Sequence, residues 1–100
     1  MKLLEAIFLV TQMPDDSCIC CVRPFHQSSD AKIVQLTAEC SLPEHALENG
    51  FEYFLEKDGI EELPGYAEGK LKSREAKTEF IVYYAEFDAY PAWFNELCAE

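Results

Sequence analysis

The hydrophobic pattern of the N-terminal segment predicts a largely buried helix. Between Lys2 and Gln12 the apolar side chains stand at positions 3, 4, 7, 8 and 10, with Ala6 and Leu9 between them. Wound as a helix, this segment leaves only a narrow polar strip at Glu5 and Gln12. A strand over residues 6–11 is the alternative, because short apolar runs fit both structures. The following Met-Pro-Asp-Asp sequence predicts a turn.

Two short apolar segments after this turn predict a pair of strands. Ser17–Arg23 contains three cysteines together with Ile and Val, and Ile33–Ala38 is similarly apolar. The connection between them is polar and about nine residues long, a length compatible with a β-hairpin. We therefore expect the two strands to be antiparallel.

The middle of the chain predicts a short helix, a strand and a second short helix. The spacing of Ser41-Leu42-Pro43-Glu44 is that of a capping box, so we expect a helix that ends at Glu48, with Asn49-Gly50 as a left-handed stop. Asp58-Gly59-Ile60-Glu61 repeats the spacing and predicts a helix from Gly59 to about Leu63.

The strand predicted between these helices is Phe51–Glu56, which alternates with period two. The alternation places Phe51, Tyr53 and Leu55 on the face toward the core, and it places Glu52, Phe54 and Glu56 on the opposite, exposed face. The exposed face would then have an apolar centre, Phe54, with a carboxylate on either side.

The longest predicted helix runs from Arg74 to about Asp88, with Ser73 as its cap. Its expected core stripe is Ala76, Phe80, Tyr83, Tyr84 and Phe87, within an arc of about 100°. Glu75, Glu79 and Glu86 lie on the opposite side, with Val82 among them. Pro91 predicts the end of this helix, and Ala92–Cys98 predicts a last short one. The aromatic residues Tyr90, Trp93 and Phe94 either seal the core or anchor a partner, and the sequence leaves both open.

Taken together, these elements predict one α+β domain over residues 1–100, with a small, mainly antiparallel sheet and helices packed against it. A chain of this length can fold without disulfides or a metal. In the first ten residues Glu5 interrupts the apolar run and only Lys2 is basic, and no small-residue cleavage site follows before Pro14, so we expect them to belong to the mature protein. No apolar run reaches about 18 residues, which predicts a cytoplasmic protein.

Charge narrows the classes of partner. The chain has 19 Asp and Glu residues against 8 Lys and Arg residues, a formal net charge of −11. Eight of the carboxylates fall between Glu39 and Glu62, where Lys57 is the single basic residue. Such a field repels nucleic acid and anionic membranes, and it accelerates association with a basic protein. We therefore expect no direct nucleic-acid or membrane binding.

No pattern of residues predicts catalysis or cofactor binding. The cysteines Cys18, Cys20 and Cys21 lie within one strand, and the other two, Cys40 and Cys98, are isolated, so neither zinc spacing nor a redox motif at a helix start is present. Both histidines are isolated and the glycines form no phosphate loop. We expect reduced, buried thiols and a protein that is not an enzyme. A small thiol or metal protein remains a third interpretation.

Several segments of the second half carry a resemblance to known proteins. They are Glu48–Leu55, Gly59–Leu63, Phe80–Tyr84 and Phe87–Tyr90. These aromatic and acidic segments resemble the second half of a group of small acidic bacterial proteins. Several of that group are immunity proteins of contact-dependent growth-inhibition or polymorphic toxin systems. The resemblance covers roughly half of the chain, and it implies inhibition by binding, without catalytic residues.

The predicted function is therefore that of an immunity protein. It would occlude a cognate basic toxin, most simply a C-terminal nuclease domain, because a nuclease cleft must be basic to hold phosphates. The alternative is an acidic mimic of nucleic acid that inhibits a DNA-binding protein. We expect the partner-binding surface at the acidic middle of the chain: Glu48, Glu52, Phe54, Glu56, Asp58, Glu61 and Glu62. If Phe54 is buried, the Glu75, Glu79, Val82 and Glu86 face of the long helix is the second choice.

Overall fold

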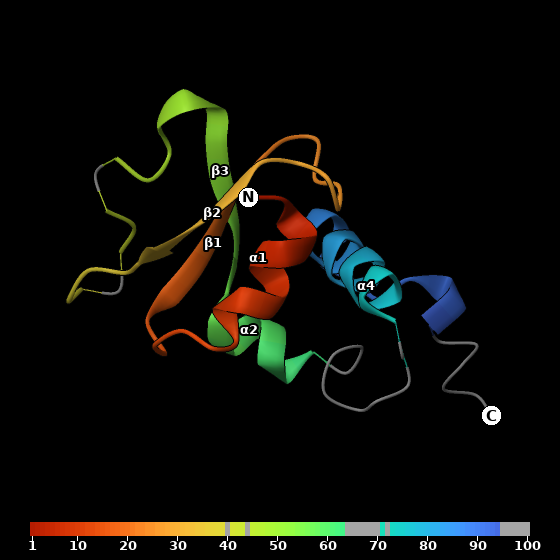
Figure 1. Ribbon diagram of the computed structural model, residues 1–100. Helices are drawn as coiled ribbons and strands as arrows, with labels where there is room; N and C mark the ends of the chain where they lie inside the picture. Colours follow the sequence, from red (N-terminus) through yellow and green to blue (C-terminus); the bar gives the residue numbers. More distant parts are fainter. Residues whose placement is uncertain (40, 44, 64–70, 72, 95–100) are drawn as a thin grey trace.

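The fold combines one three-stranded sheet with helices, as the sequence predicts. The computed structural model describes residues 1–39, 41–43, 45–63, 71 and 73–94 (Figure 1). Its elements are α1 (Leu3–Val10), β1 (Ser17–Val22), β2 (Ala31–Gln35), the 3-10 turn η1 (Glu48–Gly50), β3 (Phe51–Glu56), α2 (Lys57–Glu62) and α4 (Arg74–Phe87). None of the helices in these ranges has the length and apolar character that crossing a bilayer requires.

Strand β1 is the centre of the sheet, whose order is β2-β1-β3. Both neighbours run antiparallel to it, with Ile19 opposite Ile33 in β2 and Cys20 opposite Lys32. The predicted antiparallel pair is confirmed, although β2 begins and ends earlier than the sequence pattern indicates. Consecutive residues of β1 from Ser17 to Cys21 are buried, so both faces of this strand are covered, which explains why it is an almost continuous apolar run rather than an alternating one.

A β-bulge in the pairing of β1 with β3 changes which side chains reach the core. Ile19 pairs with Leu55, but the next residue, Cys20, pairs with Tyr53, so Phe54 is the extra residue. Partners in an antiparallel pair share a face, and a bulge interrupts the alternation. Phe54 therefore joins Leu55 on the helix side and is only 2% exposed, whereas Tyr53 is 45% exposed on the other side.

The predicted faces of β3 need correction for this reason. Leu55 packs against the core as expected, but Tyr53 does not, and Phe51 pairs with Val22 on the same outer face as Tyr53. The prediction that Phe54 is exposed is wrong. A period-two pattern assigns side chains to the correct faces only while the pairing of the strand is uninterrupted. One extra residue in the strand reverses this assignment for the residues beyond it.

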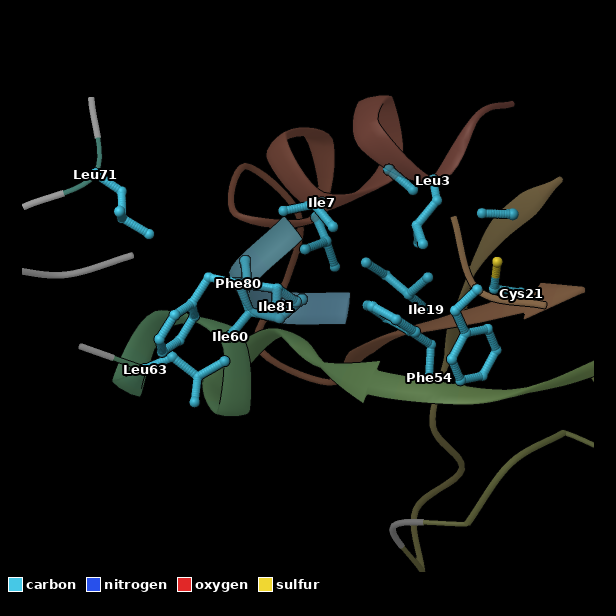
Figure 2. Packing of buried hydrophobic residues seen from close by; sticks show 14 of the residues in the cluster. Leu3, Ile7, Ile19, Cys21, Phe54, Ile60, Leu63, Leu71, Phe80 and Ile81 are labelled. Atoms are coloured by element: carbon cyan, nitrogen blue, oxygen red, sulfur yellow. The ribbon is translucent and has the colours of Figure 1, made fainter. Parts of the chain in front are cut away.

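The core lies between the sheet and the helices. Leu3, Ala6, Ile7 and Val10 of α1 are completely buried, which confirms the helix over the alternative strand. Helix α1 packs on β1 and β2, and α4 packs against α1. Figure 2 shows the α1 side chains pointing toward the sheet residues, with side chains of α4 and α2 closing the cluster.

Helix α4 is capped as predicted, but the face that it buries differs from the predicted core stripe. The Ser73 hydroxyl accepts a hydrogen bond from the Ala76 amide at 3.0 Å. Phe80 and Ile81 are both fully buried, so the centre of the buried face lies between them. Tyr83 and Phe87, which were expected in the core, are 38% and 64% exposed.

The chain before β3 forms turns instead of the predicted helix. The amide of Ala46 donates to the Pro43 carbonyl at 3.0 Å, and the Ser41 amide donates to the Thr37 hydroxyl at 3.3 Å. Glu44, the other half of the proposed capping box, lies outside the described residues. The left-handed backbone predicted at Asn49 and Gly50 is present, with φ angles of 63° and 84°, although the helix that it was expected to end is not.

The second short helix exists but begins earlier than expected. Helix α2 starts at Lys57, and its N-cap, Glu56, makes no side-chain capping bond. Asp58 therefore lies in the first turn, where its charge is favourable, and is not the cap. After α4, residues 92–94 are helical, and Phe94 packs on Phe80 with ring centroids 4.5 Å apart. The core interpretation thus holds for Phe94, which is 2% exposed.

Candidate functional site

The acidic middle of the chain does not form one surface. Glu48 precedes β3 and the α2 carboxylates follow it, so a strand of about 20 Å separates them. Glu52 pairs with Cys21 and Glu56 with Cys18, which places these two glutamates on opposite faces of the sheet. The prediction of a common face centred on Phe54 is therefore wrong.

Several of these carboxylates already have partners within the chain. Glu52 lies 3.1 Å from Arg23, and Glu61 lies 3.7 Å from Lys57. Glu48 contacts His45 at 3.0 Å. Asp58 and Glu62 are exposed on α2. A binding role for the exposed members of the predicted set stays a prediction, since no contact in the structure favours it.

The solvent side of α4 carries a different combination of groups. We define the α4 outer face as Glu75, Glu79, Tyr83, Glu86 and Phe87, which fall within an arc of about 120° at 100° per residue. All five are exposed. The rings of Tyr83 and Phe87 contact each other with centroids 4.6 Å apart. This face thus has an aromatic pair bordered by carboxylates.

The charges on the α4 outer face are only partly neutralised. Arg23, at the end of β1, donates to Glu86 at 2.5 Å and also pairs with Glu52. Among the described residues, Glu75 and Glu79 form no ion pair. Within those residues, no ion pair neutralises the N-terminal half of this face.

A hollow of about 320 Å³ adjoins this half of the face. The connection between β1 and β2 supplies one wall and α4 the other, and in Figure 1 this connection reaches toward α4. The lining residues are Phe25, His26, Gln27, Glu75, Thr78, Glu79 and Val82. Val82, which the pattern placed among glutamates without a core to enter, packs at the edge of the core and lines this hollow.

The thiols of β1 do not form a second site. Cys18, Cys20 and Cys21 are free and completely buried. A side-chain hydrogen bond with Cys18 lowers the pKa of Cys20 to about 7, and the same contact raises the pKa of Cys18. Burial nevertheless denies these sulfurs to a reactant from solution. Cys40 and Cys98 lie outside the described residues.

The described residues also give no support for metal binding or for a catalytic histidine. Those residues include no group of three His, Cys, Asp or Glu side chains that could hold a metal ion. The Nδ1 atom of His26 accepts a hydrogen bond from the Ser28 amide at 3.1 Å, and His45 pairs with Glu48. The thiol or metal interpretation therefore gains no supporting geometry.

The sequence pattern missed two parts of this site. The hydrophobic pattern places Tyr83 and Phe87 in the core, and it predicts a polar loop where Phe25, His26 and Gln27 stand. The one available signal was Val82 among glutamates on the opposite side of the predicted stripe. Comparison of the chain with protein-family models, curated proteins and solved structures gives no match.

Proposed function

We propose that this protein binds a basic protein partner through the α4 outer face and acts as an immunity protein without enzymatic activity. The observation that carries the proposal is the exposed aromatic pair. Phe87 is 64% exposed and Tyr83 is 38% exposed, and glutamates of the same helix border this pair on one side. An apolar centre with a charged rim is the usual anatomy of a protein interface.

The energetics of the face favour a protein partner over a small ligand. Exposed aromatic rings gain free energy when a partner covers them, and Tyr is enriched among interface hot spots. The net charge of −11 adds long-range attraction for a basic surface, which raises the association rate. Fast association with a few aromatic anchors suits an inhibitor that must act before its target damages the cell.

The class of partner comes from chemistry and from the resemblance together. A toxin domain that cleaves nucleic acid needs a basic cleft, and an acidic inhibitor complements that cleft. The aromatic and acidic segments resemble those of immunity proteins. The proposed partner is therefore the nuclease domain of a toxin, and the proposed compartment is the cytoplasm, where such a nuclease meets its substrate.

The direct test is co-expression with a candidate toxin domain encoded by a neighbouring gene. We expect protection of the cells and co-purification of the two proteins. The double variant Tyr83→Ala/Phe87→Ala should lose more than tenfold in affinity, whereas Tyr53→Ala, which removes an exposed ring from the sheet, should lose less than twofold. Absence of both protection and co-purification would refute the proposal.

The same experiment identifies a nucleic-acid mimic if that is the true function. A mimic would inhibit several unrelated DNA-binding proteins and would lose affinity steeply with salt, because its contacts are with phosphate-binding cations. It would also tolerate the loss of both rings. An immunity protein should instead bind one partner and keep part of its affinity at high salt through Tyr83 and Phe87.

A further inference from the structure

The hollow beside α4 combines an apolar floor with an acidic rim. Phe25 is only 8% exposed and Val82 is half-buried, so both present carbon to the space between them. The Thr78 hydroxyl already donates to the Arg74 carbonyl at 2.8 Å, so this buried polar group is satisfied within the helix. Glu75 and Glu79 stand one helical turn apart at the rim.

These features define the chemistry of an occupant. The volume of about 320 Å³ lies near the lower end of the range for small-ligand clefts, which is about 300–1,000 Å³. An apolar stem is needed to cover Phe25 and Val82, and a cationic end is needed to meet two carboxylates that lack ion pairs among the described residues. Long basic side chains are the protein groups that have both parts.

The protein contains its own example of this arrangement at the next carboxylate along α4. The guanidinium of Arg23 lies over the Phe25 ring, 4.3 Å from its centroid, and donates to Glu86. Phe25 is thus already part of an arginine site, in which a glutamate of α4 supplies the counter-charge. Glu75 and Glu79 repeat that counter-charge at the hollow, where no internal arginine is seen to pair with them.

We propose that the hollow receives an arginine side chain of the basic partner. The stem lies along Phe25 and Val82, and the planar guanidinium bridges Glu75 and Glu79, which suits its fork of donors better than the point charge of lysine. This inference rests on the proposed function, since it names a residue type that the partner contributes. It also makes the β1–β2 connection part of the docking surface.

The test titrates the full-length protein with N-acetyl-arginine amide and follows its amide NMR resonances. A single side chain supplies little affinity, so we expect saturable binding with a dissociation constant on the order of millimolar. The perturbed resonances should be those of residues 25–27 and 75–82. N-acetyl-citrulline amide, which is isosteric and neutral, should not bind, and N-acetyl-lysine amide should bind several-fold more weakly.

Matched variants separate the hollow from general charge effects. Glu75→Gln/Glu79→Gln should abolish the saturable shifts, whereas Asp58→Asn/Glu62→Gln removes the same charge from α2 and should leave them unchanged. Shifts spread evenly over all carboxylates, equal binding of citrulline, or equal loss in both variants would overturn the inference. If arginine binds here but the toxin does not co-purify, the proposed function is refuted, while the assignment of the hollow as an arginine site is retained. If the toxin binds Glu75→Gln/Glu79→Gln at full affinity, the inference alone fails.

Discussion

Phe54 of β3 lies edge-on to Phe25, with ring centroids 5.0 Å apart and ring planes at 89°. This contact joins the sheet to the connection between β1 and β2. Phe25 in turn forms part of the floor of the hollow beside α4. A residue expected to touch the partner directly thus supports, from inside the core, a residue that lines the candidate site.

Replacement of Phe54 by Ala should therefore destabilise the fold. The free energy of unfolding should fall by about 3–5 kcal/mol, the usual cost of truncating a buried aromatic ring. Tyr53→Ala removes a neighbouring ring that is 45% exposed and should cost about 1 kcal/mol or less. Urea denaturation followed by circular dichroism measures both. Equal losses in the two variants would contradict the assignment of faces in β3, and Phe54→Leu provides a milder change if the alanine variant does not fold.

The faces of β3 show where the sequence pattern stops being informative. The strand itself was predicted correctly because alternation and β-forming residues are local signals. The bulge opposite Ile19 and Cys20 is not a local signal, since it depends on how β1 and β3 align. One extra residue was enough to move the predicted centre of the binding surface into the core.

Helix capping offers a second comparison between two serines. Ser73 caps α4 although Ala76, and not Glu or Gln, stands three residues after it, whereas Ser41, which begins a complete capping-box sequence, is followed by turns within the described residues. Ser73→Ala should lower the free energy of unfolding by about 1 kcal/mol because one amide of the first turn loses its acceptor. Ser41→Ala should change it by less than about 0.5 kcal/mol. Thermal denaturation of the two variants decides the matter, and a larger loss for Ser41→Ala would contradict the assignment.

The long helix shows why its exposed face escaped the sequence pattern. Its boundaries were predicted from local capping and from Pro91. The rotation of its core stripe was not, because Phe80, Ile81 and the tyrosines around them are all apolar enough to be buried. Phe80 and Ile81 become the buried residues because α4 packs against α1 and against the aromatic residues that follow α4. Tyr83 and Phe87 are left on the solvent side by this choice, together with the glutamates.

Charge reversal should distinguish the α4 outer face from the acidic middle of the chain. Glu75→Lys/Glu79→Lys should slow association with the partner roughly tenfold at low salt, because these carboxylates rim the proposed contact. Glu56→Lys/Glu61→Lys has the same change in net charge and should slow association far less, since Glu56 lies on the opposite face of the sheet and Glu61 already contacts Lys57. Stopped-flow association rates at two salt concentrations measure the difference. Equal slowing in both variants would restore the acidic middle as the binding surface.

The Cys21 thiol should make the fold sensitive to alkaline pH. Burial raises its pKa from the ordinary 9.0 to about 11, because the thiolate would lose its hydration in the core. Between pH 9 and pH 11 the unfolded chain therefore releases a proton that the folded chain retains. The free energy of unfolding therefore decreases as the pH rises through this range. The contribution of the protonated Cys21 thiol to stability is complete only below the pKa of the thiol in the unfolded chain.

The slope of the free energy of unfolding against pH measures the titration of the Cys21 thiol separately from the packing of its sulfur. Cys21 should contribute at most about 1.4 kcal/mol per pH unit to the fall in the free energy of unfolding over this range. Cys21→Ala lowers stability at neutral pH by opening a small cavity, yet it should flatten the decline between pH 9 and pH 11. All other titratable groups are common to both proteins, so the difference between the two slopes isolates the thiol. Urea denaturation at half-unit pH steps gives both slopes, and identical slopes would show that Cys21 does not retain its proton in the folded state.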